Sequence, residues 1–182
     1  MNTPRPRTFI AHVEDRPGVL NRVISLFRRR AYNIDSLTVA RTERPNISRI
    51  TLVVMADDRE ARLLEANLYK LINVLYVEHI SDQSTVAREL ALIKVRADEE
   101  SRAKVLQLCE VFRARAIDVT PSSLMVELTG TSDKIDGLIE VLRPHGIIEM
   151  VRTGSIAMAR GAQSALTELL DAKTEPPPER AA

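Results

Sequence analysis

Residues 34–54, IDSLTVARTERPNISRITLVV, indicate the architecture of the first half of this chain. The stretch contains two runs rich in β-branched residues, IDSLTVAR (34–41) and ISRITLVV (47–54), and such runs predict strands. The residues between them, TERPN, carry the proline of a turn. We therefore expect two antiparallel strands joined by a short connection, and the flanking elements determine which sheet they enter.

A helix and a further strand flank this strand pair on each side along the sequence. Before it, RTFIAHV (7–13) alternates as a strand, and apolar residues from Val19 to Phe27 recur at helical spacing. After it, Asp57 and Asp58 can cap a second helix, and NVLYVEHIS (73–81) closes the unit as a strand. The order βαββαβ predicts a ferredoxin-like module, in which two helices cover one face of a four-stranded antiparallel sheet.

The same order of elements repeats in the second half. The predicted strands and helices are, in turn, a strand at 89–97, a helix through 105–112, strands at 116–120 and 124–130, a helix through 135–142 and a strand at 147–154. The sequence thus predicts an α+β protein of two ferredoxin-like βαββαβ modules, over residues 7–82 and 86–161. Residues 162–182 contain TEPPPER, and we expect a disordered tail there.

Composition excludes several classes that share this topology. A net charge of +1 and 3% aromatic residues argue against RNA-recognition motifs, which need basic surfaces and stacking aromatics, and against nucleic acid in general. A single cysteine excludes the paired cysteines of copper chaperones. No apolar run approaches the length of a membrane span, and the N-terminus lacks a secretory pattern, so we expect a soluble cytoplasmic protein without a membrane partner.

The stretch EDRPGVLNRV (14–23) is the strongest candidate for a ligand site. Proline is favoured in a first helical turn, and Gly18 would let a small anion approach the free amides of the helix N-terminus. The alternative is an ordinary tight turn, and on this motif alone it is the better interpretation. Asn33 begins the second strand, and we expect it at the same end of the sheet as Gly18. Its alternative role is an Asx turn.

The remaining polar residues suggest no chemistry. His12, His79 and His145 fall on different elements without metal-ligand spacing, and Cys109 lies on an apolar helix face. Paired acids occupy first helical turns, where capping explains them. We therefore predict no catalytic residues, no metal site and no cofactor in this chain.

A family resemblance rests on longer motifs. The run EDRPGVLNRVISLFRRRAYNIDSLTVARTERPNISRITLVV resembles the N-terminal ACT domain, an amino-acid-sensing module, of acetolactate synthase small (regulatory) subunits. The second half agrees with that family through FRARAIDVTPSSLMVELTGTSDKIDGLIEVLRPHGIIEMVRTGSIAMARG. The resemblance covers about residues 7–161 and implies an ACT domain followed by an ACT-like C-terminal module.

The resemblance implies a regulatory role. A separate large catalytic subunit would hold thiamin diphosphate, magnesium and FAD and condense two 2-oxo acids. This chain would raise that activity and confer feedback inhibition by a branched-chain amino acid, usually valine. The family also implies a homodimer with side-by-side ACT domains. The alternative is a free-standing ACT-type sensor that regulates another enzyme, and co-purification with a large subunit would distinguish the two.

The resemblance also implies an effector pocket around the opening turn. Pro17 shapes the turn, the amides of Gly18 and Val19 would take the effector carboxylate, and Asn33 and Ile34 of a neighbouring protomer would close the pocket. Leu20 and Val39 would form an apolar wall, and the small Ala40 would limit the effector side chain. Asp15 departs from family members with asparagine there. Its carboxylate would repel the effector carboxylate but could pair with the ammonium.

Overall fold

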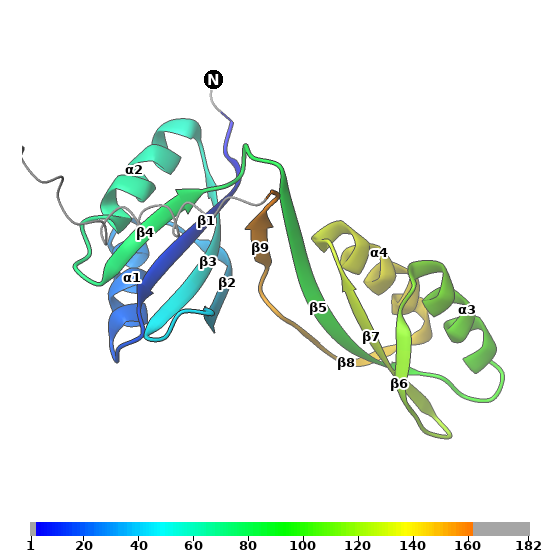
Figure 1. Cartoon of the computed structure of the whole chain (residues 1–182). Coiled ribbons are helices and arrows are strands. Elements are labelled where there is room, and N and C mark those ends of the chain that lie inside the picture. Colours follow the sequence, from blue (N-terminus) through cyan, green and yellow to red (C-terminus); the bar gives the residue numbers. More distant parts are fainter. Residues whose placement is uncertain (1–2, 162–182) are drawn as a thin grey trace, which may run out of the picture.

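The computed structural model describes residues 3–161, and the predicted tail at 162–182 lies outside this range. Figure 1 shows two lobes, each with helices on one side of a sheet. The elements, in chain order, are β1 (Arg5–Glu14), α1 (Val19–Arg29), β2 (Ile34–Arg41), β3 (Ile47–Ala56), α2 (Asp58–Leu68), β4 (Val74–His79), β5 (Thr85–Arg96), α3 (Arg102–Phe112), β6 (Arg115–Val119), β7 (Ser123–Gly130), α4 (Ser132–Leu142), the 3₁₀ turn η1 (Arg143–His145), β8 (Ile147–Arg152) and β9 (Ile156–Ala159).

The two sheets have the same topology, which confirms the predicted fold. Their strand orders are β2-β3-β1-β4 and β6-β7-β5-β8, and neighbouring strands are antiparallel. Alternation along β1 turns Phe9, Ala11 and Val13 toward the helices, where all three are buried. In the second lobe Ala91, Ile93 and Val95 of β5 take the corresponding positions. Each large side chain buried this way contributes about 1.5–3 kcal/mol.

Helix α2 begins where the sequence places its cap. The Asp57 carboxylate accepts a hydrogen bond from the Glu60 backbone N–H at 2.8 Å, and the Glu60 carboxylate accepts one from the Asp57 N–H at 2.9 Å. This reciprocal capping box satisfies two amide groups that the helix itself leaves unpaired. The predicted N-terminal signal is therefore confirmed, and the helix ends at Leu68.

Strand β9 is absent from the sequence prediction. The strand predicted at 147–154 ends at Arg152, and a further strand follows at 156–159. It pairs with the first part of β5, from Thr85↔Ala159 to Arg88↔Ile156. β5 therefore has two sets of partners: β9 at its beginning, and β7 and β8 along the rest.

The segment around β9 fastens the second lobe to the first. The Ser155 N–H donates to Ser36 Oγ at 2.7 Å, and the Arg49 guanidinium donates to the Ala157 carbonyl oxygen. Ala157 also packs with Ile10 and Ile80, both 1% exposed, on the face of the first sheet that the helices leave open. Figure 1 shows β9 beside this sheet. β9, the last strand of the second lobe, thus covers part of the first lobe.

No helix within residues 3–161 has both the length and the apolar character needed to cross a membrane.

Candidate functional site

The Pro17–Gly18 stretch forms a type II turn. Gly18 has φ +83° and ψ −9°, and the Val19 N–H donates to the Arg16 carbonyl oxygen at 3.4 Å. Such a turn favours proline at its second position and needs positive φ at its third, which glycine adopts without strain. A Cβ at Gly18 would meet no atom within 4 Å. Glycine is therefore needed here for its backbone conformation, and not because another part of the chain lies against it. This is what the interpretation as a tight turn predicts.

The turn also leaves helix amides accessible. Gly18 precedes α1 without offering a side-chain cap, and both Gly18 and Leu20 are exposed. Within residues 3–161, the N–H groups of Leu20 and Asn21 have no hydrogen-bond acceptor. Free amides at a helix N-terminus carry partial positive charge, so this end of α1 can bind a carboxylate.

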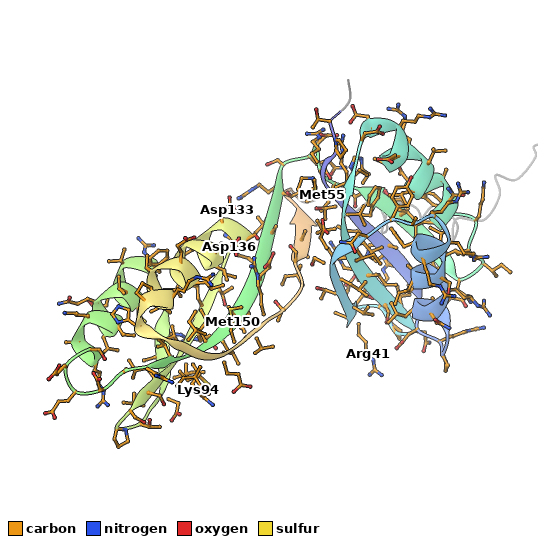
Figure 2. All side chains as sticks on the ribbon, turned by 180° about the vertical axis from the view of Figure 1, so that it is seen from behind. Arg41, Met55, Lys94, Asp133, Asp136 and Met150 are labelled. Atoms are coloured by element: carbon orange, nitrogen blue, oxygen red, sulfur yellow. The ribbon has the colours of Figure 1, made fainter. Side chains whose placement is uncertain are left out.

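Charged groups of both signs surround the turn. Asp15 Oδ2 lies 3.4 Å from Arg41 Nε, and Glu14 Oε2 lies 3.4 Å from Arg16 Nε. Arg41 projects from the end of β2 (Figure 2), and its side chain is 88% exposed. The Asp15 carboxylate is thus partly neutralised by an exposed arginine. This arrangement reduces the repulsion that Asp15 would exert on an incoming carboxylate.

Asn33 lies at the opposite end of the sheet from Gly18, so the expected common location is wrong. Ile34 pairs with Val54, which pairs with Arg7 at the beginning of β1, whereas the turn follows the end of β1. Helix α1 runs for eleven residues, about 16 Å, back along the sheet before β2 begins. The Asn33 amide donates locally to Asp35 Oδ1 at 3.0 Å. One chain alone cannot bring Asn33 to the turn.

The expected wall residues also separate. Val39 and Ala40 are successive residues of β2, so their side chains point to opposite faces of the sheet. Ala40 lines a cavity on the open face with Arg49 and residues of β9. Val19 is 4% exposed and packs in the core, so only its backbone faces the turn. Leu20 and Val39 keep exposed side chains, at 37% and 43%.

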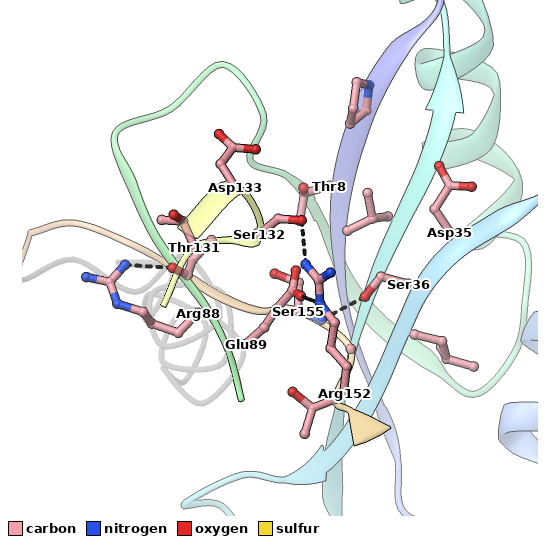
Figure 3. Close-up of a pocket in the computed structure, with 16 residues that line it drawn as sticks. Thr8, Asp35, Ser36, Arg88, Glu89, Thr131, Ser132, Asp133, Arg152 and Ser155 are labelled. Carbon is pink, nitrogen blue, oxygen red and sulfur yellow. Dashed lines mark hydrogen bonds and ion pairs between the residues drawn. The ribbon is translucent and has the colours of Figure 1, made fainter. Parts of the chain in front are cut away.

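A polar cavity of about 720 Å³ lies between the two lobes, and no pattern in the sequence predicts it. Figure 3 shows Arg152 among Glu89 and Ser132 in this cavity. Arg152 donates to the carboxylates of Glu89 and Asp136, the latter at 2.7 Å, and to Ser132 Oγ at 2.6 Å. Each of its three nitrogens donates to an acceptor of the same lobe. The cluster therefore stabilises the junction of β5, β8 and α4 and leaves little capacity for a ligand.

Within residues 3–161, His, Cys, Asp and Glu side chains do not form a group of three or more that could hold a metal ion. Burial, reinforced by the charge of Arg49 and opposed by Glu43, lowers the pKa of His12 to about 4. Burial also lowers the pKa of His79 and raises that of the Cys109 thiol. At neutral pH His12 is therefore uncharged and Cys109 is an unreactive thiol.

Two family models match the two halves of this chain. Residues 9–76 match the ACT domain described as AHAS small subunit-like, and residues 88–161 match the family described as the small subunit of acetolactate synthase. Together the matches run through both lobes and include the opening turn.

Full-length relatives agree. The acetolactate synthase small subunit of Mycobacterium bovis is 46% identical over 159 residues, covering 87% of this chain and 95% of the relative. The Bacillus subtilis small subunit is 48% identical over 83% of this chain and 88% of its own length. A crystal structure of the Thermotoga maritima small subunit superposes with a TM-score of 0.81 at 37% identity, covering 87% of this chain and 99% of that one.

Proposed function

This chain belongs to the family of acetolactate synthase small subunits, and from that membership we propose that it regulates a large catalytic subunit of that enzyme. It raises the activity of the large subunit and makes it sensitive to feedback inhibition by a branched-chain amino acid, valine being the first candidate. The observation that carries the proposal is the 46% identity to a named small subunit across 87% of the chain.

The reaction chemistry belongs to the partner in this proposal. Thiamin diphosphate, magnesium and FAD are held by the large subunit, which condenses two 2-oxo acids in the cytoplasm for branched-chain amino acid synthesis. This chain supplies no group that reacts with substrate. Its contribution is a binding free energy for the effector that differs between two states of the complex, as any allosteric inhibition requires.

The opening turn is the proposed seat of the effector carboxylate. Exposed amides after Gly18 supply donors at the positive end of α1, and Asp15 is near enough to pair with the effector ammonium. The exposed side chains of Leu20 and Val39 offer apolar contact. A zwitterion with a short aliphatic side chain matches this combination of groups.

A homodimer completes the pocket in this proposal. β2 is an edge strand of the first sheet, and an unpaired edge is a template for another strand. Antiparallel pairing of two β2 strands about Leu37 and Thr38 would set Ile34 of a second copy opposite Arg41. Asn33 of that copy would then lie at the end of the sheet that carries the Gly18 turn. Because Asn33 and Gly18 are separated within one chain, Asn33 can enter this pocket only from a second chain.

Reconstitution tests the proposed function. Acetolactate formation by the large subunit is measured alone and with this protein, across titrations of valine, leucine and isoleucine. We expect activation without effector and inhibition by one or more of the three amino acids. This protein alone should form no acetolactate. Failure to co-purify with the large subunit, together with no change in its rate, would favour a free-standing sensor instead.

A further inference from the structure

An apolar cavity of about 450 Å³ lies on the open face of the first sheet, away from the opening turn. Its walls come from both lobes: Ala40 on β2, Val86 on β5, and Ile156 and Met158 on β9. Ile156 and Met158 are 55% and 64% exposed, so β9 presents two large apolar side chains that the lobes leave uncovered. The size lies within the range of small-molecule pockets.

Two guanidinium groups, those of Arg49 and Arg88, border this apolar cavity. Within residues 3–161 neither forms an ion pair with an acid. Arg49 donates to the Ala157 carbonyl oxygen of β9, which holds its guanidinium at the cavity, whereas Arg88 is exposed and donates to the carbonyl oxygen of the preceding residue, Ala87. Each guanidinium has five N–H donors, and several of them stay available.

The charges at the cavity favour an anion over a zwitterion. Among the described residues no Asp or Glu lines the cavity, so an ammonium group would find no carboxylate there. Glu43 and Glu78 influence Arg49 only from beyond ion-pair distance. Thr38 also lines the cavity, but its hydroxyl oxygen is covered by the chain and is not exposed to a ligand. The site therefore offers cationic donors beside an apolar wall.

We propose that this cavity binds a short aliphatic carboxylate that lacks an ammonium group, with Arg88 and Arg49 on the carboxylate and Ile156 and Met158 on the hydrocarbon chain. Such a ligand would contact strands of both lobes at once, because β2 and β3 belong to the first sheet and β5 and β9 to the other. The site is separate from the proposed effector turn and does not depend on the proposed function.

Calorimetric titration of the full chain tests this site with three probes of one carbon skeleton. 3-Methylbutanoate has the carboxylate alone, L-valine adds the ammonium, and 3-methylbutan-1-ol has neither charge. We expect 3-methylbutanoate to bind at least tenfold more tightly than the alcohol. The variant Arg88→Gln should lower the affinity for 3-methylbutanoate about tenfold, because the substitution removes a charge-assisted hydrogen bond. Arg62→Gln, an exposed arginine on α2, should leave it unchanged.

A second variant fills the cavity without removing charge. Ala40→Leu adds bulk at an exposed position of the cavity wall and should also weaken the binding of 3-methylbutanoate. Absent binding, equal binding of the alcohol, or binding indifferent to both variants would overturn the proposal. If Gly18→Asp abolishes 3-methylbutanoate binding while Arg88→Gln does not, the probe occupies the effector turn and this proposal fails, although the proposed function stands. If 3-methylbutanoate binds as expected while valine does not inhibit the reconstituted enzyme, the cavity site stands and the proposed effector function fails.

Discussion

Gly18 combines a backbone angle that a turn requires with open space beside it, where the effector carboxylate is proposed to bind. Its φ of +83° lies where most side chains are strained, while the space beside it is open. A substitution therefore costs backbone strain without a clash. Asn and Asp tolerate this conformation better than other residues, and they differ from each other mainly in charge. That pair isolates the electrostatic contribution to effector binding.

We predict that Gly18→Asp weakens valine inhibition about tenfold more than Gly18→Asn does. Both variants should lose about 1 kcal/mol of unfolding free energy through the same strained backbone. The added carboxylate repels the effector carboxylate, and even one third of the roughly 4 kcal/mol expected at 4 Å and an effective dielectric of 20 corresponds to about tenfold. Inhibition curves with the reconstituted enzyme measure the difference. Equal curves for the two variants would place the effector carboxylate elsewhere.

His12 gives the protein a pH-dependent stability. Its folded pKa of about 4 lies below the ordinary value of 6.5, because burial first and Arg49 second oppose the imidazolium. The unfolded chain therefore binds more protons in this window, and the free energy of unfolding falls as pH drops from about 6.5 to 4. The full loss is about 3 kcal/mol.

We predict that His12→Gln flattens this dependence. Urea denaturation between pH 4.5 and 7.5 gives the free energy of unfolding of the native protein and of the variant. The difference between these two free energies should shrink toward low pH, because the variant has no imidazole to protonate. The carboxylates and His79 are present in both proteins, so their contributions to the pH dependence cancel in the comparison. A difference that stays constant across the range would mean that His12 is protonated equally in the folded and unfolded chains.

At the level of elements, β2 carries most of the proposed regulatory geometry. It is the edge of the first sheet, and it also contacts the segment before β9. We predict that Val39→Lys raises the dissociation constant of the proposed dimer tenfold or more, because a lysine on an edge strand opposes pairing with another strand. Sedimentation equilibrium measures the constant. Val111→Lys on α3, another exposed valine, is the matched control and should not change it.

Most elements could be predicted because their signals are local. The 34–41 strand is found with the predicted bounds, and Asp57 caps α2 as expected. β9 could not be predicted, since IAMA is short and its partner lies about 70 residues earlier in β5. The error in the relation of Asn33 to Gly18 has a different cause, because the predicted topology already determines it: α1 leads back along the sheet, so β2 begins at the end opposite to the turn. The effector pocket stays a prediction.

At the level of the whole molecule, Gly154 sets how closely the two lobes meet. A Cβ there would lie 2.5 Å from Thr38 Oγ1, 2.7 Å from the Leu37 carbonyl oxygen and 2.9 Å from Ser36 Oγ. All three atoms belong to β2, and one is backbone, so the strand cannot yield cheaply. This glycine is required for space, whereas Gly18 is required for its backbone angle.

We predict that Gly154→Ala lowers the free energy of unfolding by about 1–3 kcal/mol, the usual cost of overpacking, and loosens the lobes. Urea denaturation gives the energy, and small-angle scattering gives the change in radius of gyration. Gly130→Ala is the control: its Cβ would meet Lys134 Cδ at 2.8 Å, but this side chain is flexible and can move. Equal stability and scattering for the two variants would contradict a tight junction at β2.

The position of β9 at the end of the second lobe also has a consequence during synthesis. Ile10 and Ile80 belong to the first lobe and are made early, whereas Ala157, which covers them, is made about 80 residues after Ile80. At 5–20 residues per second, the ribosome needs roughly 4–16 seconds to reach it. In the nascent first lobe an apolar patch is thus exposed to solvent, and it becomes buried in the complete protein. For those seconds the patch is open to chaperones and to neighbouring nascent chains.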